Sequence, residues 1–364
     1  ARPIFGENVL AIDYNFADKD VLDSDITFSR ASGATQTNSS GLVAHAPHNH
    51  ITHSENLASG LGSGTPAISA VTSITDPFGG TATRKMVQTA SESGSTYQSR
   101  FTTIYGGVFR EGVASIRSIY AKKAELSWLR IQQYDGQTNG GVFFDLDNGV
   151  IGVQNTGCTG TMESLGDGWY RCSVHFVAPS GTNNSERLQV VIGNADNFIP
   201  TYVGDGASGV YLFGGMLEQV LDTSITTPSA YVKSDGGAEH APRFDFDFQK
   251  NAKGLLIEEA RTNLYQYSQE LSKTGTGAWT HTGVSVPAAS NTLDPSGGYG
   301  SYKVQQDTST GAHFIARGFS VTSGTTYTPS IFVKYVVKQY VILDFSDSFF
   351  GGSAGAIFNI NNIN

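Results

Sequence analysis

The sequence predicts an all-β protein built from tandem β-sandwich modules of jelly-roll type. Glycine supplies 43 of the 364 residues, 21 Phe and 16 Tyr accompany many Ser and Thr residues, and only 15% of the residues are charged. Such a composition is typical of strands that are joined by tight turns. Apolar and polar residues alternate with a period of two between clusters of turn residues, whereas long helical periodicity is hard to find. These observations argue against a helical or an α/β enzyme core.

Seven segments of the first two thirds of the chain combine this alternation with β-branched and aromatic residues. Their spacing is that of a sandwich or jelly roll. Asn148 and Gly149 predict a two-residue type I′ hairpin turn, and residues 160–168 read as a turn-like interval. The expected strands are 114–122, 126–134, 140–146, 150–155, 169–177, 187–193 and 209–218.

The chain repeats itself on the scale of a whole domain. HNHITHSENL, which begins at His48, corresponds to NLYQYSQEL, which begins at Asn263. DPFGGTATRKMVQTAS from Asp76 reappears as DPSGGYGSYKVQQDTS from Asp294, with the Asp, Pro, Gly, Lys, Gln and Ser positions in register. A repeat of this length indicates a domain rather than a solenoid turn.

This repeat sets the expected domain organisation. Residues 1–50 are expected to form an extended N-terminal attachment segment with short strands, because much of this segment is polar and rich in Gly, Ser and Asn. Residues 51–234 are expected as the first β-sandwich module and 235–262 as a linker. Residues 263–364 are expected as a second module that is an incomplete copy of the first, completed by further chain or by a neighbouring subunit.

The charge and the motifs exclude several classes of function. A net charge of −9 disfavours nucleic acid and anionic membrane surfaces as partners. The sequence shows no secretory leader and no run of 18 apolar residues, so we expect no membrane insertion. It contains no G-x-S-x-G, Walker, H-E-x-x-H or C-x-x-C motif, and the adjacent Glu258 and Glu259 would face opposite ways in a strand. The expected protein is therefore not an enzyme and takes no cofactor.

Cysteine and histidine residues also bear on the expected chemistry. Alternation in WYRCSVHF puts Cys172 on the apolar side of a strand, which favours a buried free thiol over a bridge to Cys158, although a single disulfide stays an alternative. DLDNG, residues 145–149, resembles part of a calcium loop but lacks the distal Glu. Four of the eight histidines lie in HAPHNHITH and are interpreted as ordinary turn or surface residues, so we expect no metal site. These four are His45, His48, His50 and His53.

Pleat geometry suggests a candidate ligand-binding face. In SWLRIQQY, Leu129 and Ile131 should point into the core, and the residues between them should point away from it. If this strand and WYRCSVHF share a sheet, their outward residues form one surface of aromatic and hydrogen-bonding groups that suits a sugar. The alternative is that a loop, the adjoining domain or another subunit covers these side chains. The candidate residues are Trp128, Arg130, Gln132, Tyr134, Trp169, Arg171 and His175, with Tyr340 at the position of Trp128 in the second copy.

Four segments carry a resemblance to a known class of proteins. They are ITFSRASGAT, APRFDFDFQKNAKGLLIEEARTNLYQYSQEL, GDGWYRCSV and YVGDGASGVYLFGGMLE. With them the chain resembles bacteriophage tail-fibre and minor structural proteins that carry carbohydrate-binding-like β-sandwich modules. The resemblance implies a homotrimeric protein of the virion surface that acts in assembly and host adsorption and contacts host-surface glycans and other virion proteins. A polysaccharide-degrading tailspike and a purely structural capsid or tail decoration protein are the two alternatives.

Overall fold

The fold is almost entirely β-structure, as the sequence predicts. The computed structural model describes residues 16, 22, 26–30, 33–90, 96–104, 112–134, 139–179, 186–258, 262–265, 267–287, 292–298, 300–347 and 352–361. Within these residues the one helix is α1 (Leu57–Gly60), and all other regular elements are strands. No helix in the described part of the chain is long and apolar enough to cross a bilayer. The chain divides into two units: Ala1–Ala260 with Ser296–Tyr299, and Arg261–Pro295 with Gly300–Asn364.

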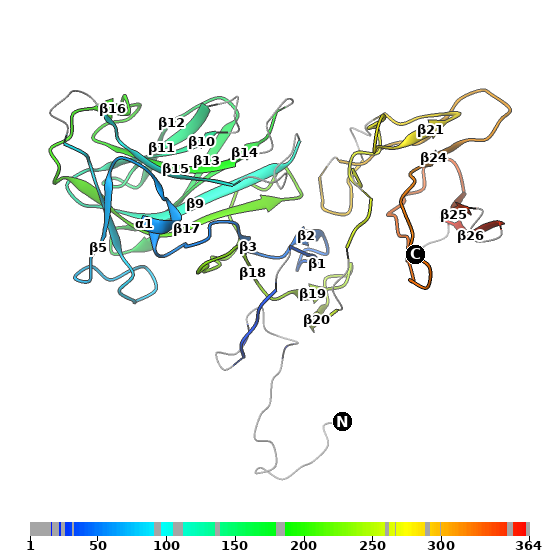
Figure 1. Ribbon diagram of the computed structural model, residues 1–364, viewed down its shortest axis with the longest axis horizontal. Coiled ribbons are helices and arrows are strands. Elements are labelled where there is room, and N and C mark those ends of the chain that lie inside the picture. The colour runs from blue at the N-terminus through cyan, green and yellow to red at the C-terminus, as the bar shows by residue number, and fades with distance from the viewer. Residues whose placement is uncertain are drawn as a thin grey trace, which may run out of the picture. The chain divides into compact units, whose positions relative to one another are not determined.

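The first unit contains a sandwich of two six-stranded antiparallel sheets (Figure 1). Sheet A has the strand order β12 (Val150–Gln154), β11 (Asn139–Asp145), β10 (Trp128–Tyr134), β15 (Glu186–Gly193), β8 (Ser99–Ile104) and β4 (Ser63–Gly64). Sheet B has the order β13 (Cys158–Gly166), β14 (Trp169–Val177), β9 (Ala114–Lys123), β17 (Gly209–Val220), β6 (Arg84–Val87) and β5 (Ala67–Ala70).

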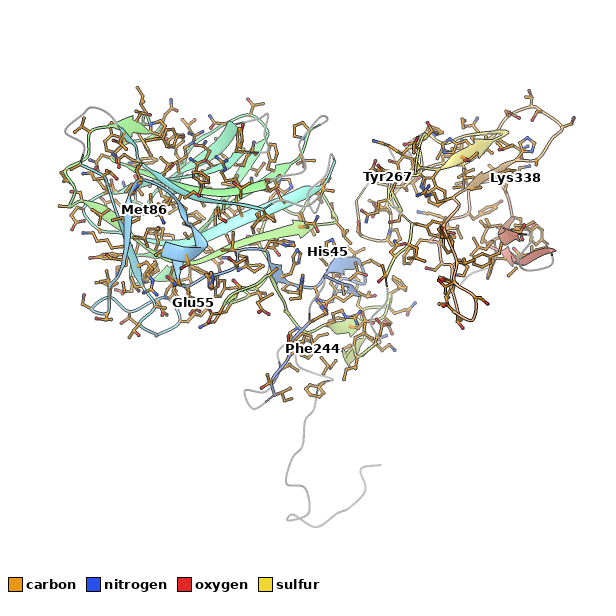
Figure 2. All side chains as sticks on the ribbon, in the orientation of Figure 1. His45, Glu55, Met86, Phe244, Tyr267 and Lys338 are labelled. Carbon is orange, nitrogen blue, oxygen red and sulfur yellow. The ribbon has the colours of Figure 1, made fainter. Side chains whose placement is uncertain are left out.

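Figure 2 draws the side chains on the ribbon. The core lies between the two sheets, where alternate side chains of the longer strands point inward. Leu129 and Ile131 of β10 are fully buried there, together with Cys172 and Val174 of β14. Burying one large aliphatic side chain contributes roughly 1.5–3 kcal/mol. The seven predicted strands are confirmed to within two residues at their ends, because alternation with a period of two is what a half-buried strand requires.

The predicted type I′ turn at Asn148 and Gly149 is wrong. The loop between β11 and β12 has four residues, and only Gly149 has a positive φ, of 67°. Its shape is set by Asp145, whose Oδ1 accepts the N–H groups of Asp147 at 2.9 Å and Asn148 at 3.2 Å. The Asp145 side chain therefore acts as a cap for the loop. The described residues hold no group of three or more His, Cys, Asp or Glu side chains placed to share a metal ion.

The interval 160–168, interpreted as turn-like, belongs mostly to strand β13. The chain reverses only at Gly166, Asp167 and Gly168, all of which have positive φ. On the hairpin that results, Cys172 lies opposite Met162 and Cys158 lies opposite Phe176. Both thiols are free and buried, and burial raises the pKa of each. The predicted core position of Cys172 is confirmed.

A buried ion pair joins the two sheets inside the sandwich. Arg117 of β9 donates from Nη2 to Oε2 of Glu186 of β15 at 2.5 Å, and the same nitrogen donates to Oγ of Ser115 at 2.7 Å. The two charged side chains are 0% and 1% exposed. Water therefore does not screen this pair, and each charge depends on the other.

The N-terminal part of the first unit pairs with the segment that was expected as a linker. The N–H of Thr37 donates to Oδ1 of Asp245 at 2.6 Å. Asn49 holds this part to the sandwich, because its Nδ2 donates to the carbonyl oxygens of Gly215 and Val232, each at 2.9 Å. The strands are β1 (Thr35–Thr37) with β2 (Val43–His45), β3 (His48–Asn49) with β18 (Glu239–His240), and β19 (Phe244–Phe246) with β20 (Ala252–Leu255). A further short pair is β7 (Thr96–Tyr97) with β16 (Thr201–Tyr202).

The described residues of the second unit form three two-stranded ladders. They are β21 (Thr280–Thr282) with β24 (Phe314–Ala316), β22 (Val284–Ser285) with β23 (Gln305–Gln306), and β25 (Tyr340–Asp347) with β26 (Gly352–Asn359). Among its described residues the second unit has no stacked pair of sheets, and apolar side chains such as Val337 and Ile357 are exposed. The expected second β-sandwich module, an incomplete copy of the first, therefore stays a prediction.

Several local contacts recur at the repeated sequence positions. The ladder of β25 and β26 sets Tyr340 opposite Asn359, as β10 and β11 set Trp128 opposite Asp145. Side-chain contacts to the backbone recur as well. Asn49 Oδ1 accepts the N–H of Ile51 in the first copy, and Asn263 Oδ1 accepts the N–H of Tyr265 in the second. Asp76 Oδ2 accepts the N–H of Ala82, and Asp294 Oδ2 accepts the N–H of Gly300. Arg100 donates to the carbonyl oxygen of Leu61, and Arg317 to that of Ala278. The asparagine and aspartate bonds are local and match in both units, whereas the arginine contact recurs through different nitrogens, Nε of Arg100 at 2.8 Å and Nη1 of Arg317 at 3.5 Å.

Candidate functional site

The structure does not bring the predicted binding residues together on one surface. Their outward orientation is confirmed, but the premise that the two strands share a sheet is wrong, because β10 belongs to sheet A and β14 to sheet B. The outward residues of the two strands therefore lie on opposite outer faces of the sandwich. Tyr340 lies on β25 of the second unit and is 59% exposed.

On sheet A the predicted residues are largely engaged in contacts within the protein. Arg130 donates from Nη2 to Oδ1 of Asn155 at 3.0 Å, and its guanidinium lies 5.2 Å from the ring centroid of Phe143. The Tyr97 hydroxyl donates to Oε1 of Gln132 at 2.9 Å. Trp128 and Tyr134 are half-buried. The Trp128 ring lies so close to Gly152 that a β-carbon there would stand only 2.7 Å from it. Tyr134 lies beside the guanidinium of Arg187.

On sheet B the predicted residues are covered, as the alternative interpretation expected. Trp169 is 2% exposed and donates from Nε1 to the carbonyl oxygen of Thr75 at 3.0 Å. Arg171 is 6% exposed and donates from Nη1 to the carbonyl oxygen of Ser229 at 2.7 Å. His175 is buried as well. Trp169 and Arg171 therefore anchor two segments that cross the outer face of sheet B.

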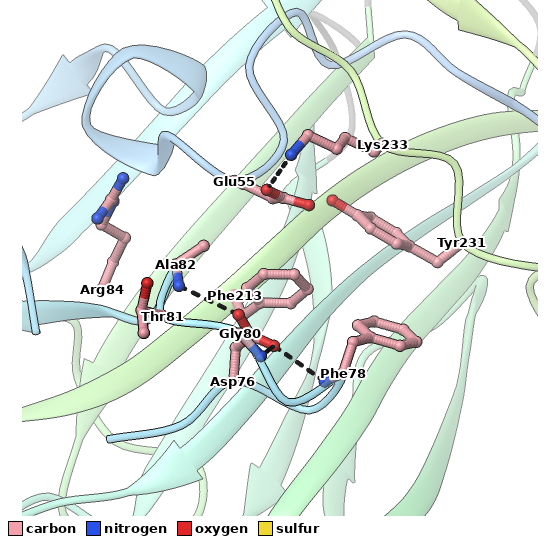
Figure 3. Close-up of a pocket in the computed structure, with 10 residues that line it drawn as sticks. All are labelled: Glu55, Asp76, Phe78, Gly80, Thr81, Ala82, Arg84, Phe213, Tyr231 and Lys233. Carbon is pink, nitrogen blue, oxygen red and sulfur yellow. Dashed lines mark hydrogen bonds and ion pairs between the residues drawn. The ribbon is translucent and has the colours of Figure 1, made fainter. Parts of the chain in front are cut away.

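These covering segments build an open pocket of about 660 Å³ on sheet B (Figure 3). Its size falls within the roughly 300–1,000 Å³ that is usual for small-molecule sites. Sheet B forms the floor of the pocket. The walls are formed by the loop that carries Phe78, by Glu55, and by Tyr231 and Lys233. The lining residues are Glu55, Asp76, Phe78, Gly80, Thr81, Ala82, Arg84, Phe213, Tyr231 and Lys233.

Asp76 fixes the loop that carries Phe78 into this pocket. Its Oδ1 accepts the N–H groups of Phe78 at 2.9 Å and Gly80 at 3.0 Å, and its Oδ2 accepts the N–H of Ala82 at 3.1 Å. Gly79 has a φ of 87°, a conformation that strains a residue with a β-carbon. A carboxylate that accepts three backbone N–H groups holds the loop in one shape, so Phe78 is presented without a large ordering cost.

The aromatic rings of the pocket form one cluster. Phe78 stacks on Tyr231 at a centroid distance of 5.8 Å and an interplanar angle of 17°. It also meets Tyr120 edge to face at 5.5 Å and lies 5.8 Å from Phe213. Phe78 is nevertheless 61% exposed. An exposed ring on a rigid aromatic base is the kind of surface on which the C–H face of a sugar can stack.

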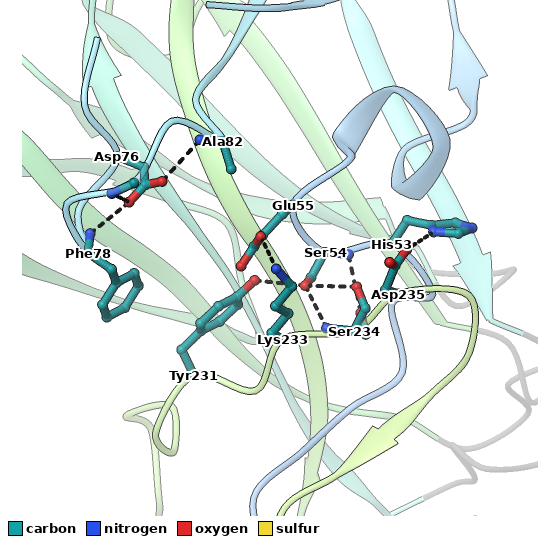
Figure 4. Close-up of polar contacts among 11 residues, drawn as sticks. His53, Ser54, Glu55, Asp76, Phe78, Ala82, Tyr231, Lys233, Ser234 and Asp235 are labelled. Atoms are coloured by element: carbon teal, nitrogen blue, oxygen red, sulfur yellow. Dashed lines mark hydrogen bonds and ion pairs between the residues drawn. The ribbon is translucent and has the colours of Figure 1, made fainter. Parts of the chain in front are cut away.

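Polar groups surround this aromatic cluster (Figure 4). Lys233 donates from Nζ to Oε2 of Glu55 at 2.6 Å. The Tyr231 hydroxyl donates to Oγ of Ser54 at 2.7 Å, which fixes the orientation of the Tyr231 ring. Arg84 also lines the pocket, and in Figure 3 no hydrogen bond or ion pair joins its guanidinium to the other lining residues drawn. The pocket thus offers an apolar platform, cationic donors and two carboxylates, those of Glu55 and Asp76.

Glu218 supports the pocket from beneath the segment that carries Tyr231. It is 2% exposed, and both its carboxyl oxygens accept hydrogen bonds from Ser229, one from the N–H at 2.8 Å and one from the hydroxyl. Burial raises the pKa of Glu218 to about 7, although the bonds from Ser229 and the charge of Arg171 oppose the shift.

This raised pKa predicts a pH dependence of stability. The folded state keeps its proton on Glu218 at pH values where the unfolded chain has lost it, so the free energy of unfolding should fall as the pH rises from about 4.5 to about 7. The size of this fall is on the order of 3 kcal/mol. We expect Glu218→Gln to lose this component and the exposed Glu163→Gln to keep it. Urea unfolding at several pH values measures both, and identical pH profiles for the two variants would contradict the assignment.

Neither a model of a known protein family nor a curated protein sequence matches the chain. The pocket is therefore judged on its geometry alone. Sequence reasoning missed Phe78, Glu55, Tyr231 and Lys233, because separate segments supply them. One signal was present in the repeat: DPFGG and DPSGG keep the residues that shape the loop but exchange Phe78 for Ser296. A position that varies while its loop is retained is not needed for the fold of that loop.

Proposed function

We propose that this chain is a non-enzymatic structural component of a phage virion, part of a tail fibre or spike, which binds a host-surface glycan through the pocket on sheet B. In this proposal it acts as a homotrimer in assembly and host adsorption and contacts other virion proteins. The virion assignment rests on the resemblance of four sequence segments. The glycan assignment rests on the exposed Phe78 ring above an aromatic base with charged groups around it.

The chemistry of the pocket favours binding of a sugar over its hydrolysis. Glycoside hydrolysis needs two carboxyl groups that flank the bond, one of them available to donate a proton. Here Asp76 is engaged by three backbone N–H groups and Glu55 by Lys233. Both carboxylates thus have structural partners, whereas Phe78 and Arg84 are free to contact a ligand in the described pocket. This arrangement supports the binding proposal over the polysaccharide-degrading alternative.

The test compares two exposed phenylalanines. We expect Phe78→Ala to weaken binding of the protein to host-surface polysaccharide by tenfold or more, since buried or stacked aromatic anchors carry much of the free energy of an interface. Phe248→Ala is the matched control, because Phe248 is 57% exposed and lies outside the pocket. Binding to immobilised polysaccharide and the melting temperature are measured for both variants. Equal binding by the two variants, with both folded, would exclude the pocket as the glycan site.

A further inference from the structure

Four histidines gather where the N-terminal segment meets the sandwich, in the region of His45 in Figure 2. The ring centroids of His48 and His50 are 5.0 Å apart, those of His45 and His48 are 5.4 Å apart, and His48 stacks on His240 at 5.9 Å. Three of these residues come from 45–50 and the fourth from β18. The interpretation of this run as ordinary turn or surface histidines is wrong for His48, which pairing of β3 with β18 buries to 3% exposure, whereas His45 and His50 are half-buried.

Two groups at this cluster hold hydrogen-bonding atoms that the protein does not use. Nε, Nη1 and Nη2 of Arg30 are inaccessible to solvent, and none has a hydrogen-bond partner in the described part of the chain. His240 is 7% exposed, and its Nδ1 likewise has no partner there. A buried donor without a partner costs about 1–3 kcal/mol, and more when it is charged. Such groups call for an acceptor from outside the chain.

The electrostatic surroundings point to the charge of that acceptor. Burial, and to a smaller extent the neighbouring histidines, lower the pKa values of His45 and His240 to about 4. Arg30 lowers the pKa values of His48 and His240. The side chains whose charge acts on these rings are the other imidazoles and Arg30, with no carboxylate among them, and at neutral pH the charged one is Arg30. The adjoining Arg243, in contrast, has Glu258 as its partner at 2.8 Å.

We propose that Arg30 and His240 form a binding site for an oxyanion of the phosphate or sulfate type. Guanidinium groups match the geometry of such anions and bind them through paired N–H donors. The Gly33 backbone does not press on the His240 ring, since a β-carbon on Gly33 would stand 3.7 Å from Cε1 and 3.9 Å from Nδ1, which are ordinary contact distances. The bound anion would supply the missing acceptors and offset the positive charge. This site is separate from the pocket on sheet B and does not depend on the proposed glycan binding.

The test measures thermal stability of the full chain in sodium phosphate and in sodium chloride at matched ionic strength. A ligand that binds only the folded state raises the melting temperature with its concentration. We expect a saturable rise in phosphate for the wild-type protein and for Arg187→Gln, a control arginine on sheet A. We expect no such rise for Arg30→Gln. An equal rise in Arg30→Gln, or no rise in the wild-type protein, would overturn the proposal.

Titration calorimetry provides a second measurement if Arg30→Gln does not fold. Phosphate should give saturable heat with the wild-type protein and at least tenfold weaker binding with His240→Gln. Glucose 6-phosphate, used in parallel, separates the two sources of the anion: binding of both probes assigns a site open to a sugar-borne phosphate, and binding of phosphate alone assigns a site for the free ion. Failure of both probes to bind refutes the site.

Discussion

Replacing Glu186 by alanine should lower the free energy of unfolding by about 3–5 kcal/mol, because the change leaves Arg117 as an uncompensated charge inside the sandwich. Arg117 is 0% exposed, and its Nη2 is held at 2.5 Å from Glu186 Oε2. Water cannot reach the guanidinium without disrupting the core. Urea denaturation at neutral pH, with the slope of the transition checked for two-state behaviour, measures the loss.

Two controls separate burial from ion pairing as such. Asp147→Ala breaks the pair between Lys123 and Asp147, whose side chains are 41% and 53% exposed, and should cost less than about 1 kcal/mol. The double variant Arg117→Met with Glu186→Leu removes both buried charges and should recover most of the stability lost in Glu186→Ala. A double variant as unstable as Glu186→Ala would show that the pair is needed for more than mutual neutralisation.

Acidification from pH 6.5 to pH 4 should destabilise the first unit strongly through the histidine cluster. Burial is the main cause that lowers the pKa of His50 to about 3 and the pKa values of His45 and His240 to about 4. The unfolded chain binds protons on these rings near pH 6.5 and the folded chain does not, so stability is fully present above pH 6.5 and is lost as the pH falls. The pKa shift of His45 alone corresponds to roughly 3 kcal/mol in the free energy of unfolding.

The hydrogen bonds of His48 give this loss a structural cause. Its Nδ1 bonds to the carbonyl oxygen of Ala46 at 2.9 Å, and its Nε2 accepts the N–H of Gln219 at 3.0 Å. A proton on Nε2 would face that N–H group and break the contact between the N-terminal segment and β17. The charged groups that act on the cluster are Arg30 and the other imidazoles, so further protonation adds like charge.

Unfolding followed by fluorescence between pH 4 and pH 8 checks this prediction. His50→Gln should flatten the acid side of the profile, whereas His313→Gln, a histidine of the second unit that contacts Asp307 at 3.2 Å, should not. Glu218 acts in the opposite direction over part of the same range, so the comparison is best made in a Glu218→Gln background. An acid limb of unchanged steepness in His50→Gln would contradict the assignment to the cluster.

Local sequence was sufficient for the strands and for the orientation of their side chains. Alternation placed Leu129, Ile131 and Cys172 in the core, and the structure buries all three. This information is local, because successive side chains on any strand point to opposite sides. In the repeated DPFGG and DPSGG segments the aspartate likewise accepts the N–H group six residues further on, from Ala82 and from Gly300, since this contact spans only a few residues.

The tertiary structure decided which of these side chains reach solvent and which meet. Because β10 and β14 belong to different sheets, Trp128 and Trp169 lie on opposite faces of the sandwich. The segments around Thr75 and Ser229 cover the outer face of sheet B, where Trp169 lies. The pocket joins Glu55, Phe78 and Tyr231, and the histidine cluster joins His48 to His240, across long stretches of chain. Alternation fixes the side of a strand on which a residue lies, but what covers that side depends on strand order and on long-range contacts, which no local pattern encodes.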